Sequence, residues 1–484
     1  MNKFSKKISE IIKSKKLAVY SVAKNCNIER TYLSRVLSGE RTLQYDKLDA
    51  LLRCLDLSPS EEVELRKIYV ADFFGNERYE KYIDFINKIS QLDTPDEAPT
   101  LNPSIKITLD LDNDFVSFNG LLDTANVVDF AVGNEFSKEG VSTRLYTNLP
   151  SKSIFPVIRK YIDTIPDTMD FKHMISINQN DEFALDAIFD IVSFLKFGCF
   201  TLYHNSDSSS LCTPDTLFPY YVITKELCIF INGSFDSCHI VRNKALADIQ
   251  AHEFLRKSKS AKKYITIYDD ILSCKESCQQ IHSVGYDRMY SFGTFCATLY
   301  MTADMWEQIA KEEIPSRDYL IKSTYEYYSS FAEIYKDKYQ IYLKDSIDDF
   351  INHGIVKNIP LEYTNPLTPK NRLRVLENFK KSLLKTKRQF LLVKDPRIEK
   401  LKDVSIEVFE KSDNEKIKFL SFYSMTEAAP MRYLGNINCN IDEPKTIEEF
   451  LQFTKYFSVS GACYTYEESM AILDDAIERC RAMK

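Results

Sequence analysis

The eleven residues from Asp93 to Pro103 divide the chain into two parts whose hydrophobic residues follow different periodicities. This segment contains three prolines and three acidic residues, which is typical of a linker. Before it, apolar residues recur at intervals of three and four positions, as they do along the faces of helices. After it, short β-branched and aromatic runs alternate with helical patterns. The sequence therefore predicts a multidomain protein with an all-α N-terminal domain and a large α/β or α+β body.

Local signals within the body refine this prediction. The run Leu227–Ile231 leads into Asn232-Gly233, the strongest short hairpin signal. The apolar, β-branched run Val127–Val132 predicts another strand. Thr446–Glu449 and Thr465–Glu468 both fit the capping box that begins a helix. No internal sequence repeat is evident.

A break near residues 310–340 suggests that the body has two lobes. We expect four parts, namely a helical domain over 1–70, a connecting helix and linker over 71–103, an α/β lobe over 104–320 and an α+β lobe over 321–484.

Composition excludes several classes of protein. No apolar run approaches the ~20 residues that a membrane-spanning helix needs, and no apolar stretch follows the charged N-terminus as in a secretory signal. The 12 cysteines are scattered over 484 residues, which indicates reduced thiols. We therefore expect a cytoplasmic protein that does not associate with membranes.

The charge is unevenly distributed. Residues 1–53 contain 12 Lys and Arg against 5 Asp and Glu, whereas the rest of the chain has a net charge of −14. This asymmetry suggests a small anion-binding domain joined to an acidic body.

The segment Leu17–Gly39, LAVYSVAKNCNIERTYLSRVLSG, carries three residue types at defined spacing. Ala23 is small enough for two helices to cross closely. Asn27, four residues later, tolerates the left-handed backbone of a tight turn. Leu33, ten residues after Ala23, anchors the second helix. With its flanking helices, over residues 4–58, this segment resembles the helix-turn-helix of Cro/XRE-type transcriptional regulators, the class that includes the lambdoid phage repressors.

The resemblance implies a lambda-repressor-like fold and double-stranded DNA as the partner. A recognition helix places its N-terminal residues on base edges in the major groove. We expect Arg30 and Tyr32 to read bases and Arg41 to meet the DNA backbone. The full set of candidate DNA-binding residues is Glu29, Arg30, Thr31, Tyr32, Ser34, Arg35 and Arg41. The alternative is a helical hairpin used for protein contacts, with Arg30 and Arg35 as solvated surface charges.

Catalytic and metal signals are weak. His252-Glu253 begins like a zinc-protease motif, but Arg256 stands where the second histidine belongs. Cys274, Cys278 and His282 are spaced at i, i+4 and i+8, and the outer two lie about 12 Å apart along a helix, too far to share one zinc ion. We expect no catalytic residue, no cofactor and no metal site.

The sequence predicts a transcriptional regulator rather than an enzyme, with a body that senses an unidentified effector or partner and forms a homodimer. We expect the amphipathic segment Tyr79–Ile89 and the acidic body to provide the dimer contacts. The alternative is an effector enzyme, for example in phage defence, whose DNA-binding domain targets it or represses its own gene. A cleft lined by polar groups with perturbed pKa values would favour the enzyme.

Overall fold

The computed structural model describes residues 2–90, 115–138, 142–161, 169–175, 185, 200–204, 217–268, 283–314, 316–334, 337–357, 359, 363–385, 389–401, 404–414, 418–425 and 436–483. The chain forms two compact units. Unit 1 comprises residues 1–92, 270–427 and 447–484, and unit 2 comprises residues 93–269 and 428–446. The N-terminal helices thus belong to the same unit as most of the C-terminal half of the chain.

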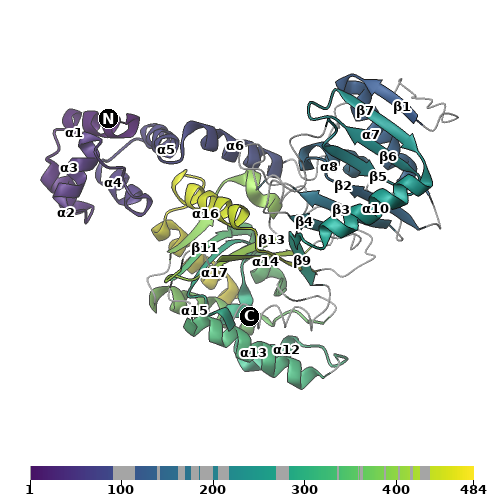
Figure 1. The fold of residues 1–484 in the computed structure, drawn as a ribbon. Helices are drawn as coiled ribbons and strands as arrows, with labels where there is room; N and C mark the ends of the chain where they lie inside the picture. The colour runs from purple at the N-terminus through teal and green to yellow at the C-terminus, as the bar shows by residue number, and fades with distance from the viewer. Residues whose placement is uncertain are drawn as a thin grey trace. The chain divides into compact units, whose positions relative to one another are not determined.

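Six helices begin unit 1 (Figure 1). They are α1 (Lys3–Ser14), α2 (Val19–Asn25), α3 (Arg30–Ser38), α4 (Leu48–Cys54), α5 (Pro59–Phe74) and α6 (Asn76–Ser90). We call residues 2–74, which span α1 to α5, the head. A capping box starts α5, because the hydroxyl of Ser58 accepts from the amide of Glu61 while the Glu61 carboxylate accepts from the amide of Ser58. Pro59 follows at the first helical position, where its missing N–H costs nothing.

The amphipathic segment predicted at Tyr79–Ile89 is part of α6, and its apolar face is buried within the chain. Tyr82 and Phe85 are almost fully buried. Their rings contact Tyr456 and Phe453 of α16 (Pro444–Val459), with centroids 4.9 and 5.0 Å apart. Our expectation that this face forms a dimer contact is therefore wrong, because α16 of the same chain already covers it.

The sheet of unit 1 is mixed. It contains β10 (Arg288–Gly293), β11 (Asp337–Leu343), β12 (Gln389–Val393), β13 (Val404–Glu410) and β14 (Lys418–Met425). In the order β12-β11-β10-β13-β14, the first three strands are parallel and the last two pair antiparallel.

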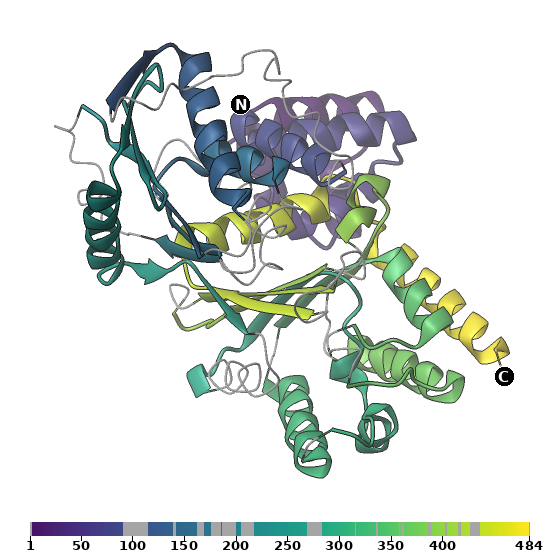
Figure 2. The same ribbon diagram turned by 90° about the vertical axis from the view of Figure 1, so that its right-hand side faces the viewer.

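Helices cover both faces of this sheet (Figure 2). On one face, Phe292 of β10 packs against Phe453 and Phe457 of α16 at 5.8 and 5.4 Å between ring centroids. On the other face, Tyr342 and neighbouring apolar side chains form the main core. The helices that contribute to this core are α12 (Ala303–Ile309), α13 (Arg317–Ile334), α14 (Lys344–His353), α15 (Pro369–Lys385) and α17 (Tyr466–Ala482).

Unit 2 is built on an eight-stranded mixed sheet in the order β1-β7-β6-β5-β2-β3-β4-β8. Its strands are β1 (Phe115–Asn119), β2 (Thr143–Thr147), β3 (Met169–Ile175), β4 (Phe200–His204), β5 (Tyr220–Ile223), β6 (Leu227–Ile231), β7 (Ser237–Arg242) and β8 (Lys262–Lys263). Its helices include α7 (Leu121–Phe136), α8 (Ser151–Lys160) and α10 (Lys244–Ser258), and β9 (Ile265–Tyr268) pairs antiparallel with β15 (Asn436–Ile441).

The two sheets repeat one connection pattern, although the sequence shows no repeat. In unit 2, β2, β3 and β4 are parallel neighbours, and β2 continues through antiparallel β5 to β6. In unit 1, β10, β11 and β12 are parallel in the same sequential order, and β10 continues through antiparallel β13 to β14. The predicted α/β character is thus confirmed as two mixed sheets preceded by a helical region.

Local predictions in the body had mixed outcomes. The hairpin at Asn232 is confirmed, but its loop runs to Asp236, and Phe235 rather than Gly233 takes the positive φ of 62°. The strand predicted at Val127–Val132 is wrong, because these residues lie inside α7. Thr465 caps α17 as predicted, whereas α16 begins at Pro444, ahead of Thr446.

Within the residues that the structure describes, no helix is both long enough and apolar enough to cross a membrane.

Candidate nucleic-acid interface

The head is held together by the residues that its motif predicted. Ala23 of α2 is 2% exposed, and Leu33 of α3 is fully buried. Val36 is also fully buried, one turn along α3, and Ile28 is buried in the turn between the helices. These apolar contacts fix the crossing of α2 and α3, so the position of α3 in the head follows from packing.

The turn between α2 and α3 has the left-handed residue that the spacing predicted. Asn27 has a φ of 52°, and the next amide, that of Ile28, donates to the carbonyl oxygen of Ala23 at 2.9 Å. Asparagine tolerates this conformation better than other residues with a side chain. At the other end of α3, Gly39 takes a φ of 80° and ends the helix.

Helix α1 binds the last turn of α3. The buried hydroxyl of Ser5 donates to the carbonyl oxygen of Val36 at 2.6 Å, and the hydroxyl of Ser9 donates to that of Leu37 at 3.2 Å. The carbonyl oxygen of Leu37 is one of the last four of the helix, which lack an intrahelical partner, and that of Val36 also accepts from the amide of Gly39 at 3.0 Å. The hydrogen bonds from α1 fix the C-terminal end of α3, while its N-terminal end faces solvent.

Most of the candidate DNA-binding side chains lie on this exposed side. The exposed members are Glu29, Arg30, Thr31, Ser34, Arg35 and Arg41. Glu29 is the N-cap residue of α3, but its side chain makes no capping hydrogen bond. Among the described residues, the guanidinium groups of Arg30, Arg35 and Arg41 have no carboxylate or carbonyl partner. Three unneutralised cations on and just after one short helix can meet phosphates or guanine edges.

Tyr32 is placed differently from the others. It is half-buried, its hydroxyl donates to the carbonyl oxygen of Thr42 at 3.1 Å, and it accepts from the amide of Gln44 at 2.9 Å. The phenol therefore ties α3 to the loop that follows Arg41. In this position the Tyr32 hydroxyl orients the loop, and its hydrogen bonds are already used within the head.

A buried tyrosine supports the same loop from the opposite side. The hydroxyl of Tyr69 on α5 donates to the carbonyl oxygen of Leu43 at 2.8 Å, and burial raises the pKa of Tyr69 well above its usual range. Its ring meets Phe4 of α1 edge to face at 4.9 Å. Sequence reasoning did not identify this residue, because its role depends on contacts between distant elements.

A separate row of polar residues crosses the sheet of unit 1. Ser291 lies beside Gln340 on one side and beside Glu407 on the other, and Ser421 lies beside Glu407, so all four share one face. All four are buried. Burial raises the pKa of Glu407 to about 7, partly offset by the nearby Lys338.

No group of three or more His, Cys, Asp or Glu side chains in the described parts of the chain is arranged to hold a metal ion. The sequence candidates Cys274, Cys278 and His282 lie outside the described residues. His252 and Glu253 lie on α10, where Glu253 pairs with Arg256 at 2.7 Å.

Comparisons with known proteins do not identify a family. No protein-family model and no curated protein matches the chain. Among solved structures, the archaeal chromatin protein TrmBL2 aligns with 47% of this chain and 86% of its own, at 12% identity and a TM-score of 0.24. Phosphatidylserine synthase from Haemophilus influenzae aligns with 76% of this chain and 93% of its own, at 9% identity and a TM-score of 0.25. Polyphosphate kinase from Porphyromonas gingivalis aligns with 76% of this chain and 55% of its own, at 9% identity and a TM-score of 0.22. These scores are too low to indicate a shared fold.

Proposed function

We propose that the protein is a sequence-specific, DNA-binding regulator of transcription of the Cro/XRE type, and that α3 is its recognition helix. The observation that carries this proposal is the exposure of Arg30, Arg35 and Arg41 on α3 and its following loop, where none of them pairs with a carboxylate among the described residues. Three such cations close together offer a surface that an anionic partner can neutralise. The net positive charge of residues 1–53 supports an anionic partner of high charge density.

The body is then the part that senses an effector or partner and pairs two heads. One helix-turn-helix covers a half-site, and specific binding usually requires two of them about one helical turn apart on DNA. The acidic body also repels the phosphate backbone, which confines DNA contact to the heads. A homodimer formed through the body fits this arrangement, since the apolar face of α6 is occupied within the chain.

The alternative, an effector enzyme with a DNA-binding head, needs a reactive site in the body. The polar row at Ser291, Gln340 and Glu407 is the described cluster nearest to such a site, but its side chains are enclosed. The regulator is therefore the better supported of the two functions.

The decisive experiment is selection of bound duplexes from a random DNA pool by the full-length protein, followed by titration at several salt concentrations. Affinity should fall steeply with salt, because phosphate contacts release counterions. Arg30→Ala should weaken binding to the selected sequence by about 1–3 kcal/mol and relax the preference at one base pair. Lys67→Ala, which removes an exposed charge from α5, is the matched control and should change binding little. Absence of DNA binding at low salt would refute the proposal.

A further inference from the structure

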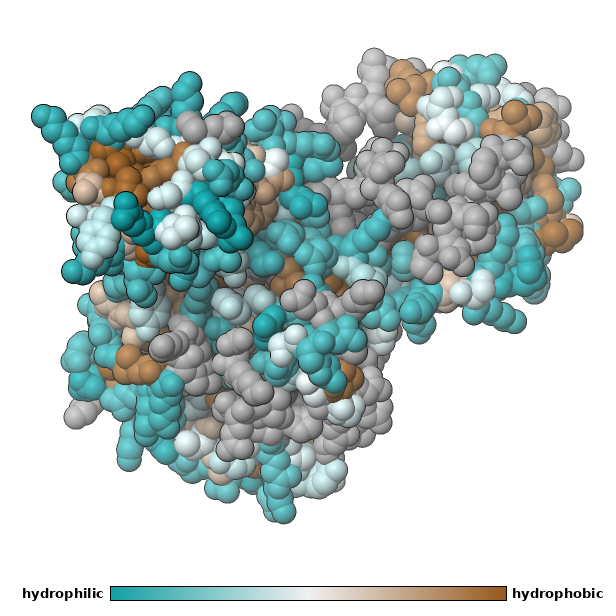
Figure 3. Space-filling view, turned by 60° about the vertical axis from the view of Figure 1, so that its left-hand side comes forward, coloured by the Kyte–Doolittle hydropathy of each residue, from teal (hydrophilic) through white to brown (hydrophobic). Residues whose placement is uncertain are grey.

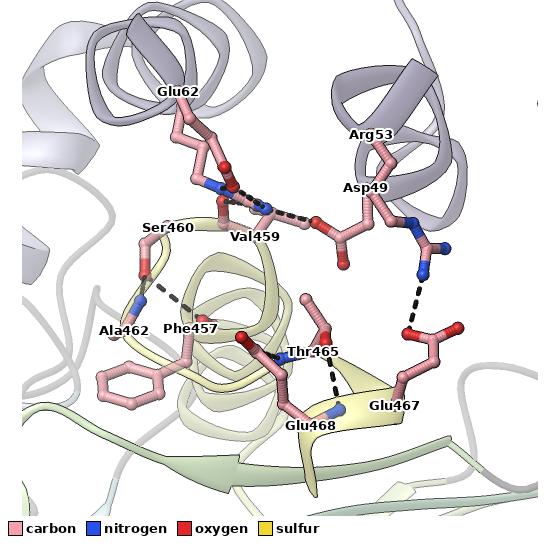
Figure 4. Close-up of polar contacts among 11 residues, drawn as sticks. Asp49, Arg53, Glu62, Phe457, Val459, Ser460, Ala462, Thr465, Glu467 and Glu468 are labelled. Atoms are coloured by element: carbon pink, nitrogen blue, oxygen red, sulfur yellow. Dashed lines mark hydrogen bonds and ion pairs between the residues drawn. The ribbon is translucent and has the colours of Figure 1, made fainter. Parts of the chain in front are cut away.

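A buried arginine links the head to the C-terminal half of unit 1. Arg66 of α5 is 7% exposed. Its guanidinium donates to Glu62 at 2.9 Å, to Asp49 of α4 at 2.7 Å, and to the carbonyl oxygen of Val459 at 3.1 Å. Figure 4 shows these groups converging at the end of α16. One planar side chain thus binds two elements of the head and the last residue of a body helix at once.

The charge on Arg66 is retained despite its burial. Burial alone would lower the pKa of Arg66, but the carboxylates of Asp49 and Glu62 outweigh this effect and raise the pKa above its ordinary value. A buried ion pair stabilises a structure only when the remaining donors also find partners. The carbonyl oxygen of Val459 is such a partner, so the head–body contact satisfies a donor that the two carboxylates do not.

The turn between α16 and α17 is shaped to receive Arg66. Gly461 in this turn has a φ of 88°, and a Cβ built on it would lie 3.1 Å from Cδ of Arg66. Glycine here therefore meets two requirements, a left-handed backbone and close approach of the arginine stem.

The same turn is bonded to the sheet of unit 1. The amide of Lys394 donates to the carbonyl oxygen of Ala462 at 2.9 Å, and the amide of Tyr464 donates to that of Leu392 at 2.8 Å. The amide of Leu392 in turn donates to the hydroxyl oxygen of Ser469 at 2.9 Å. The turn is thus held by backbone hydrogen bonds to the end of β12.

Two further contacts flank the arginine. Arg53 of α4 pairs with Glu467 of α17 at 2.7 Å, with both side chains more than half exposed. Tyr45, in the short helix η1 (Tyr45–Lys47), lines a shallow groove with Tyr339 of β11 and Ser458 of α16. Contacts from η1, α4 and α5 thus join the head to β11, α16 and α17 at more than one place.

We propose that Arg66 is a positioning residue, which with Gly461 locks the head onto the α16–α17 turn so that the body sets the orientation of the recognition helix. The inference rests on the proposed DNA-binding function and deepens it. The body then controls more than the distance between two heads, because it also fixes the angle at which each α3 meets the groove. A flexible tether would leave that angle free.

The first test needs no DNA. A fluorescent amino acid replaces Lys24, an exposed residue of α2, in the full-length chain, and the decay of its anisotropy is recorded. Without substitution at position 66, the label should tumble slowly with the whole particle. Arg66→Met should add a faster component, because the head can then rock about its remaining contacts, the Arg53–Glu467 pair and the packing of Phe74 on Tyr456. Lys67→Met removes the neighbouring exposed charge and should leave the decay unchanged.

Two further variants distinguish loss of the head–body contact from unfolding of the head. Gly461→Ala changes only the body side of the contact, and it should produce the same fast component while the helical circular dichroism of the head is retained. Arg66→Lys keeps the charge, but its three donors sit on one nitrogen and cannot reproduce the planar spread of the guanidinium, so it should give a fast component of smaller amplitude. A single slow decay in both Arg66→Met and Gly461→Ala would overturn the proposal.

The second test uses the selected DNA. Insertion of about five base pairs between half-sites turns one of them to the opposite side of the duplex, since one helical turn is about 10 base pairs. The unsubstituted protein should bind the DNA with the insertion at least about tenfold more weakly than the DNA without it. For Arg66→Met, the loss of affinity caused by the insertion should be several-fold smaller. Equal losses would contradict the positioning role. If none of the variants binds DNA, the proposed function fails, and the anisotropy decay still decides the head–body inference.

Discussion

The hydroxyl of Tyr32 bridges α3 and the loop after it, donating to the carbonyl oxygen of Thr42 and accepting from the amide of Gln44. Tyr32→Phe removes both bonds and keeps the ring. We expect a loss of about 0.5–1.5 kcal/mol in the free energy of unfolding. We also expect DNA affinity to fall by a similar factor on every sequence, because the loop that carries Arg41 loses its anchor. A loss confined to one base position would instead make Tyr32 a base reader.

The left-handed turn predicts the effect of substitutions at Asn27. Asn27→Val should destabilise the head by about 1–2 kcal/mol, because a β-branched residue is disfavoured at a φ of 52°. Asn27→Gly should leave the stability nearly unchanged. Thermal unfolding of both variants measures the difference. Equal melting temperatures for valine and glycine would show that the turn relaxes to another conformation.

The buried carboxyl of Glu407 predicts a pH dependence of stability. Its pKa is raised to about 7 in the folded state, above its ordinary value of 4.5. Between these two pH values the unfolded chain releases the proton and the folded chain retains it, so stability should fall as pH rises through this window. The loss approaches about 3 kcal/mol, since one pKa unit corresponds to about 1.4 kcal/mol.

Glu407→Gln should abolish this slope, because the amide cannot ionise. Urea unfolding at pH 5 and pH 8 measures it, with Glu312→Gln, a highly exposed glutamate, as the control. The prediction is wrong if the slope persists in Glu407→Gln. Lys338, the charged group that faces Glu407, would then be the next side chain to test.

Assembly gives the last prediction. The large apolar side chains of the head are mostly buried in its own core, and its exposed large hydrophobic side chains are Tyr20 and Val63. The face shown in Figure 3 is mostly hydrophilic, with hydrophobic residues gathered in a patch at its upper left. Residues 1–70 alone should therefore be monomeric, and the full chain should be a homodimer. Light scattering distinguishes the two states, and titration should show weaker operator binding by the fragment. A monomeric full chain would contradict the proposal.

Short-range signals in the sequence were enough to predict the head. Ala23, Asn27 and Leu33 act within ten residues of one another, and their roles are set by backbone geometry. The prediction of a strand at Val127–Val132 failed because it relied on the β-branched side chains of this run and not on its spacing. The buried positions Thr124, Val127, Val128 and Ala131 follow helical spacing, which was the better guide.

The head–body contact could not be predicted in the same way. From the sequence alone, Arg66 would be predicted to lie on the polar side of an amphipathic helix and to pair with Glu62 at i, i+4. Its third partner is a backbone carbonyl 393 residues later, which no side-chain pattern encodes. Likewise, the polar row of Ser291, Gln340 and Glu407 exists only through the register of strands that are distant in the chain.

The distance along the chain between Arg66 and Val459 has a consequence for biosynthesis. Domains fold progressively from the N-terminus during translation. The head has its own core and can fold early, but its contact with the carbonyl oxygen of Val459 cannot form until that residue has left the ribosome. A nascent chain that stops before residue 459 would display α3 without the turn that holds Arg66. Synthesis through residue 459 is thus a condition for docking of the head.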